Sequence, residues 1–210
     1  MFLATLRCNL SMNRNIVLKA IVLGMALFSA VMASGQKYFG PKCLGLYCVD
    51  RDTRVSDVLK KLGPAPARSS EFAPYCYESP EQKAFLYLRS AEAVPPTVDA
   101  VLLADFPICA NMPVAFAKDE LNAWKTPQGI GLGSSEQDVL NAYGKPSREE
   151  KLDSKIYKEI IQGYKKGDPL PDAGDKEFVY GAGATAGDLS LARFGMRNGK
   201  VSYIWLSYSE

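Results

Sequence analysis

The amino-acid sequence predicts an α+β protein built from two tandem modules, each consisting of a helix followed by strands. The main observation is an internal repeat, because residues 55–64 recur in similar form as residues 136–146. A repeated unit of this kind is typical of modules arranged in tandem. Each copy leads into runs in which apolar and polar residues alternate, as in strands with one buried face. We therefore expect a first module over residues 36–112 and a second over residues 113–210.

The first 35 residues have the pattern of a secretory signal peptide and are left out of the predicted fold. Basic residues up to Lys19 precede an apolar run over residues 20–32, which is followed by the small residues Ala33, Ser34 and Gly35. The apolar run is too short for a comfortable membrane span. The rest of the chain is expected to be periplasmic or secreted, with no stable membrane span.

Composition narrows the classes of function. The formal net charge of +2 becomes about −1 without the signal, so no basic stripe points to nucleic acid. The chain contains no histidine, which removes the commonest general base and the usual catalytic triads. No nucleophile and base stand in a recognisable pattern, so we predict a protein that is not an enzyme and uses no cofactor.

Four cysteines remain after the signal, and all of them lie in the first module. An even number of cysteines in an oxidising compartment favours two disulfides, and sequence leaves all three pairings open. A zinc site is disfavoured because the chain lacks histidine and paired Cys-x-x-Cys clamps. The disulfide candidates are Cys43, Cys48, Cys76 and Cys109.

The first module is expected to hold one helix and three strands. Val55, Val58, Leu59 and Leu62 have helical spacing, with Asp52 or Thr53 as the cap and Gly63 and Pro64 as the stop. Strands are predicted over residues 75–78, 83–90 and 98–106. The third is apolar throughout, which is typical of a central strand.

The second module is expected to begin after a linker with a short helix over residues 118–124. Ser134 and Gln137 form a helix start, and Val139, Leu140 and Tyr143 form its buried face. An insertion at about 147–176 contains a further helical pattern from Leu152 to Tyr164. Strands follow over 176–180, 189–196 and 201–207, the last two joined by a tight turn at Asn198-Gly199.

Residues 129–146, from the glycine-rich entry to the helix end, resemble the small outer-membrane assembly lipoprotein family, the SmpA/OmlA or BamE-like group. Residues 194–204 look like the last hairpin of that family. The tandem arrangement is similar to that of the two-module beta-lactamase inhibitor proteins. The resemblance implies that each module packs its helices on one face of a small antiparallel sheet. It also implies a non-enzymatic role in binding other proteins.

The face of each sheet that helices leave open is the predicted partner-binding surface. Side chains alternate along a strand, so Phe85, Tyr87 and Arg89 share one face, and Tyr203 and Trp205 share another. Tyr, Trp and Arg dominate the energetics of protein interfaces. The alternative is that these aromatic faces pack on each other or on the insertion. The predicted partner-binding residues are Tyr77, Phe85, Tyr87, Arg89, Tyr180, Tyr203 and Trp205.

Two further motifs have simple structural explanations. The glycines at 129, 131 and 133 precede a helix but lack the strand and βαβ context of a phosphate loop, so we interpret them as a tight turn. Asp168, Asp172 and Asp175 lack EF-hand spacing and are interpreted as a solvated loop.

The predicted function is a periplasmic protein-binding module, in outer-membrane or envelope assembly or maintenance. The alternative is an inhibitor or immunity protein that blocks a secreted or periplasmic enzyme. A third hypothesis, a small-ligand binder between the modules, has no supporting motif.

Overall fold

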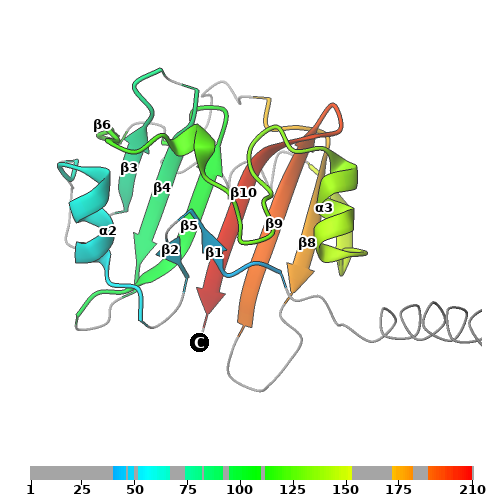
Figure 1. The fold of residues 1–210 in the computed structure, drawn as a ribbon, viewed down its shortest axis with the longest axis horizontal. Coiled ribbons are helices and arrows are strands. Elements are labelled where there is room, and N and C mark those ends of the chain that lie inside the picture. Colours follow the sequence, from blue (N-terminus) through cyan, green and yellow to red (C-terminus); the bar gives the residue numbers. More distant parts are fainter. Residues whose placement is uncertain are drawn as a thin grey trace, which may run out of the picture. The chain divides into compact units, whose positions relative to one another are not determined.

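The computed structural model describes residues 40–45, 47–49, 52–66, 74–81, 83–91, 95–109, 112–152, 172–181 and 189–209. The signal segment and the helical part of the insertion lie outside these residues. The described chain falls within one compact unit, Tyr38–Glu210. Its main element is a single mixed sheet of eight strands (Figure 1).

Ten strands and two α-helices make up the described fold. A small hairpin of β1 (Cys43–Leu44) and β2 (Tyr47–Cys48) precedes helix α2 (Val55–Leu62). Strands β3 (Tyr75–Glu78), β4 (Phe85–Ser90), β5 (Val98–Ala104) and β6 (Ala115–Phe116) come next, before the 3₁₀ turn η2 (Leu121–Ala123) and α3 (Glu136–Tyr143). The chain then forms β7 (Arg148–Lys151), β8 (Lys176–Gly181), β9 (Leu189–Arg197) and β10 (Lys200–Ser209).

The predicted fold class is wrong in its central feature, because the strands do not form two small sheets. The order in the eight-stranded sheet is β6-β3-β4-β5-β10-β9-β8-β7. Strands β5 and β10 pair antiparallel in the middle, with Tyr203 opposite Ala104 and Ser207 opposite Ala100. Both strands carry mostly buried side chains. Two separate sheets would leave the backbone N–H and C=O groups of both strands exposed as edges, and the pairing of β5 with β10 satisfies these groups. The expectation that the third predicted strand is central is confirmed.

One face of the sheet carries both helices and most of the core. Val58 and Leu62 of α2 pack over the β3–β4–β5 side, whereas Val139 and Tyr143 of α3 pack over the β8–β9 side (Figure 1). The Tyr143 ring stacks on Phe194 at 5.4 Å between centroids. We call this the helix face, and the opposite side the second face.

The two helices begin differently from the prediction. Arg54 is the N-cap of α2 and makes no side-chain capping bond, so neither Asp52 nor Thr53 caps it. In α3 the cap is Ser135 rather than Ser134, and the partner is Asp138 rather than Gln137. The Ser135 hydroxyl accepts from the Asp138 N–H at 3.1 Å, and the Asp138 carboxylate accepts from the Ser135 N–H at 2.9 Å. These reciprocal bonds form a capping box one residue later than expected.

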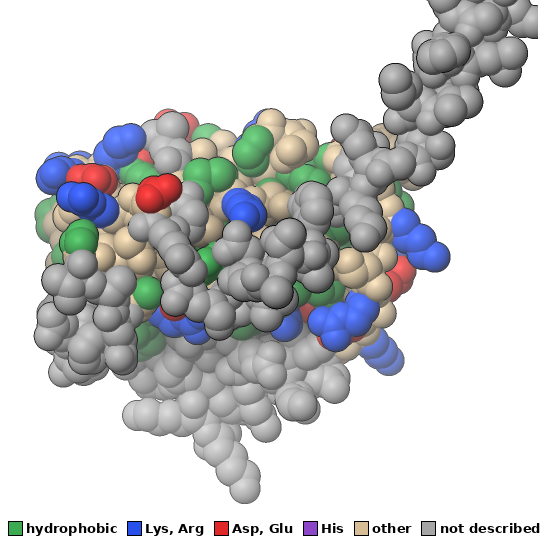
Figure 2. Space-filling model, turned by 90° about the horizontal axis from the view of Figure 1, so that it is seen from below, with side chains coloured by type: hydrophobic (Ala, Val, Ile, Leu, Met, Phe, Trp, Pro, Cys, Tyr) green, Lys and Arg blue, Asp and Glu red, His purple; other side chains and the backbone are tan. Residues whose placement is uncertain are grey.

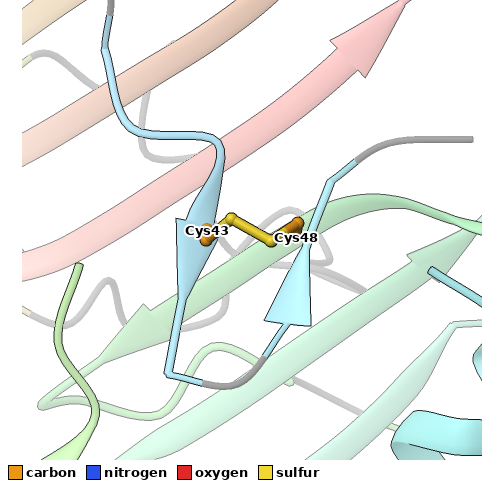
Figure 3. Close-up of a disulfide and its surroundings, with 2 residues drawn as sticks. All are labelled: Cys43 and Cys48. Carbon is orange, nitrogen blue, oxygen red and sulfur yellow. A yellow bond between two sulfur atoms is a disulfide. The ribbon is translucent and has the colours of Figure 1, made fainter. Parts of the chain in front are cut away.

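The β1–β2 hairpin lies over the helix face between the two helices (Figure 1). Leu44 and Tyr47 are buried there, and the Tyr47 ring lies 5.3 Å from that of Trp124. The hairpin is closed by a disulfide between Cys43 and Cys48, which face each other across the two strands (Figure 3). A second disulfide joins Cys76 on β3 to Cys109 after β5. Two disulfides are compatible with a protein that folds outside the cytoplasm, and no helix among the described residues is long and apolar enough to cross a membrane.

Candidate protein-binding surface

A continuous row of paired residues crosses all eight strands on the second face. Directly paired residues in a sheet point their side chains to the same side, so strand register decides which residues meet. One end of the row holds Phe116 and Phe85 on either side of Glu78, near the β6 edge, and the other end holds Glu177 and Glu150, near the β7 edge. In spatial order the row is Phe116, Glu78, Phe85, Ala104, Tyr203, Gly195, Glu177 and Glu150.

The middle of this face is a buried core with a polar cluster. Tyr203 and Glu177 are both fully buried, and the Tyr203 hydroxyl donates a hydrogen bond to the Glu177 carboxylate. Arg193 Nη1 lies 3.5 Å from the other carboxylate oxygen and so provides the opposite charge. The Arg193 guanidinium also lies over the Trp205 ring at 5.1 Å from its centroid. This arrangement compensates a buried carboxylate with a donor and a cation, as burial of a charge requires.

Three of the predicted partner-binding residues on this face are therefore not open surface. Tyr203 is fully buried, Tyr87 is only 5% exposed and Trp205 is half-buried. They pack with Phe106, Ile108 and Leu152 from the segments that follow β5 and β7. Burial raises the pKa of the Tyr87 hydroxyl, with the nearby Arg89 lowering it and Asp99 raising it. These three side chains are thus covered by other segments of the chain, and one of the covering residues, Leu152, belongs to the predicted insertion.

Tyr77 and Tyr180 lie on the helix face, so they do not belong with the other predicted residues. Tyr77 pairs with Leu86 rather than with Phe85 or Tyr87, and this register places it among the residues under α2. Tyr180 pairs with Ala192, and its hydroxyl donates to the Gly144 carbonyl at the end of α3 at 3.0 Å. Burial raises the pKa of each hydroxyl to about 12. Alternation along each strand was predicted correctly, but the relative register of different strands was not.

The exposed end of the second face lies at the β6 edge. Phe116 is 60% exposed and Val114 is 39% exposed, and these are the exposed large hydrophobic side chains within the described ranges. Phe85, two strands away in the same row, is partly buried against the core of the second face. Arg89 lies further along β4 and forms an ion pair with Asp99 at 3.0 Å. Of the residues predicted for binding, Phe85 and Arg89 are thus the two near open surface at this end.

Val114, Phe116 and Glu78 are candidate surface residues that the sequence analysis did not identify. The run Val114-Ala115-Phe116-Ala117 alternates large and small apolar residues directly after Pro113. This alternation is a signal for a short strand with one apolar side. It was overlooked because the run falls in the segment interpreted as a linker between modules.

The opposite edge of the sheet has a contrasting character. Strand β7 presents Arg148, Glu149, Glu150 and Lys151, and charged residues of this kind prevent an edge strand from pairing with other chains.

On the face seen in Figure 2, basic side chains are scattered among acidic and hydrophobic ones.

Two other features of the described chain are weaker candidates for a site than the β6 edge. A shallow depression of about 490 Å³ lies between the 125–134 loop and α3, lined by Lys125, Gln128, Asp138 and Asn141 among others. In the described residues, no three Cys, Asp or Glu side chains are grouped as metal ligands would be. The depression is open and its loop glycines serve turns, with Gly129 and Gly133 at positive φ.

Comparisons with known proteins give no relative. No protein-family model matches the chain, and neither a curated protein nor a solved structure matches it. The resemblance to the outer-membrane assembly lipoproteins therefore remains a prediction.

Proposed function

We propose that this chain is a non-enzymatic module that binds another protein outside the cytoplasm, in the periplasm or cell envelope. The observation that carries the proposal is the exposed apolar edge formed by Phe116 and Val114. Phe116 is 60% exposed on an edge strand, and contact between an apolar side chain and water is unfavourable. Burying this ring against a partner surface would therefore stabilise the complex. The two disulfides support a location outside the cytoplasm.

The sheet gives this edge a rigid base. Strand β6 pairs with β3, and the Cys76–Cys109 disulfide links β3 to the segment that leads into β6. A surface held in place before binding loses little conformational entropy when it meets a partner. The rest of the second face serves as a core that supports the edge, which replaces the earlier expectation that the whole aromatic face contacts the partner.

The test is cross-linking and capture from envelope extracts with the full chain. We compare wild type with a Val114→Ser/Phe116→Ser double variant and with a Lys151→Ser control, which changes an exposed residue on the opposite edge. The proposal predicts a partner that wild type and the control retain and that the double variant loses. Equal capture by all three proteins would contradict it. Whether the captured partner is an envelope component or a secreted enzyme distinguishes a module in envelope assembly or maintenance from an inhibitor.

A further inference from the structure

We infer that the carboxylate of Glu78, between Phe116 and Phe85, receives a cationic side chain of the protein partner, an arginine or a lysine. This inference rests on the proposed function and adds the chemistry of recognition.

Register places the three side chains next to one another. Glu78 on β3 pairs with Phe116 on β6 and with Phe85 on β4, so all three point to the second face. The Cβ atoms of directly paired residues are about 5 Å apart, so one cationic side chain lying across the row can touch all three side chains. Glu78 is half-buried, and Phe116 beside it is open to solvent.

The charges of the fold leave Glu78 available. Within the described part of the chain its carboxylate makes no hydrogen bond or ion pair. Lys83, in the turn between β3 and β4, already has an acceptor, since its Nζ lies 2.7 Å from Glu81. Arg89 stands four residues beyond Phe85 on β4 and pairs with Asp99 at 3.0 Å. The stem of Lys118, two residues after Phe116, lies against Gly63. Glu78 is therefore a negative group without a counter-charge between two phenylalanines.

The flanking rings favour the same kind of ligand. The face of an aromatic ring carries negative potential, so two phenylalanines beside a carboxylate attract a cation and repel an anion. The aliphatic stem of arginine or lysine would cover the exposed ring of Phe116 while its charged end meets Glu78. Arginine fits best, because its planar guanidinium can bond a carboxylate with two parallel N–H groups and stack on a ring.

The test uses defined peptides rather than an unknown partner. The probes are a capped heptapeptide with one arginine between valines and its counterparts carrying citrulline or glutamate in place of the arginine. Binding to the isotope-labelled full chain is followed by NMR, reading the backbone amides of Glu78, Phe85 and Phe116. The proteins are wild type, Glu78→Gln and a Glu149→Gln control, which makes the same change of charge at the exposed edge opposite.

The expected result is that the arginine peptide binds wild type about five-fold more tightly than the citrulline peptide, as for a partly exposed ion pair. Glu78→Gln should remove this difference, and Glu149→Gln should retain it. Added salt should weaken the binding of the arginine peptide and leave the affinity for the citrulline peptide unchanged. Equal affinity for arginine and citrulline, preference for glutamate, or no shift at these amides would overturn the inference.

The two proposals can fail separately. If the Val114→Ser/Phe116→Ser variant loses its captured partner while Glu78→Gln retains it at full strength, the protein-binding function stands and the cationic ligand is wrong. If capture is unaffected by either change, the proposed function itself is wrong.

Discussion

The Tyr203 hydroxyl on β10 donates a hydrogen bond to the Glu177 carboxylate on β8, reaching across the whole of strand β9. The residue between them in the cross-strand row is Gly195, and the Tyr203 ring occupies the space where a side chain at 195 would stand. A buried donor, a buried acceptor and a glycine on three neighbouring strands therefore depend on one another. This contact requires the observed relative register of β8, β9 and β10.

We predict that Tyr203→Phe destabilises the fold by roughly 2 kcal/mol, because the buried Glu177 carboxylate loses a charge-assisted donor. Tyr77→Phe is the matched control, since the Tyr77 hydroxyl is buried and no described group hydrogen-bonds to it. Removing that hydroxyl should leave stability unchanged or raise it slightly. Urea unfolding of both variants measures the difference, and equal stabilities would show that the Glu177 contact contributes nothing.

Gly195→Ala should lower the free energy of unfolding by roughly 3 kcal/mol, because the new methyl group would overlap the Tyr203 ring. Gly181→Ala is the comparison, since a Cβ there meets no atom within 4 Å and the expected change is within about 0.5 kcal/mol. In a Tyr203→Ala background the cost of Gly195→Ala should fall by about 2 kcal/mol, which a double-mutant cycle measures. An unchanged cost in that background would mean that the strain lies in the strand and not in the contact with Tyr203.

The two disulfides should contribute unequally to stability. Their cysteines are separated by 33 residues in the Cys76–Cys109 pair and by 5 in the Cys43–Cys48 pair. Loop-closure entropy gives about 3.7 kcal/mol for the long loop and about 2.1 kcal/mol for the short one. Replacing each pair by alanine and measuring urea unfolding tests the order, and a larger loss from the Cys43–Cys48 pair would refute the entropic account.

Local patterns allowed several elements to be predicted correctly. The Asn198-Gly199 turn between β9 and β10 is confirmed, with φ of 53° and 71° at the two residues. The alternation of Phe85 and Tyr87 against Leu86 and Leu88 is also confirmed. These features depend on dihedral preferences and on a period of two residues, which neighbouring residues in the chain encode.

The errors concern contacts between residues far apart in the chain. Nothing near Leu102 or Trp205 specifies that they pair, yet the β5–β10 contact is what joins the strands into one sheet. The same holds for Tyr77, whose face depends on pairing with Leu86 and not with Phe85. Because a shift of one residue in register reverses the face of every side chain, an error in pairing moved two tyrosines to the wrong surface. The short apolar strand β6 was missed because its residues fall in the segment interpreted as a linker.

Alkaline pH should unfold the protein through its buried tyrosines. Burial raises the pKa of Tyr143 to about 12, although its hydrogen bond to Thr126 acts in the opposite direction, and burial raises those of Tyr77 and Tyr180 to the same value. In the unfolded chain these hydroxyls ionise near pH 10. Above that pH the unfolded state binds fewer protons than the folded state, so stability is complete below about pH 10 and falls between about pH 10 and 12.

Tyrosinate absorbance and circular dichroism followed together over this range provide the measurement. The buried tyrosines should ionise only as the circular dichroism signal is lost. Tyr143→Phe removes one of these hydroxyls. Measured relative to its own free energy of unfolding at neutral pH, the variant should lose stability less steeply with rising pH than wild type. Ionisation of all tyrosines near pH 10 with the fold intact would contradict the burial of these hydroxyls.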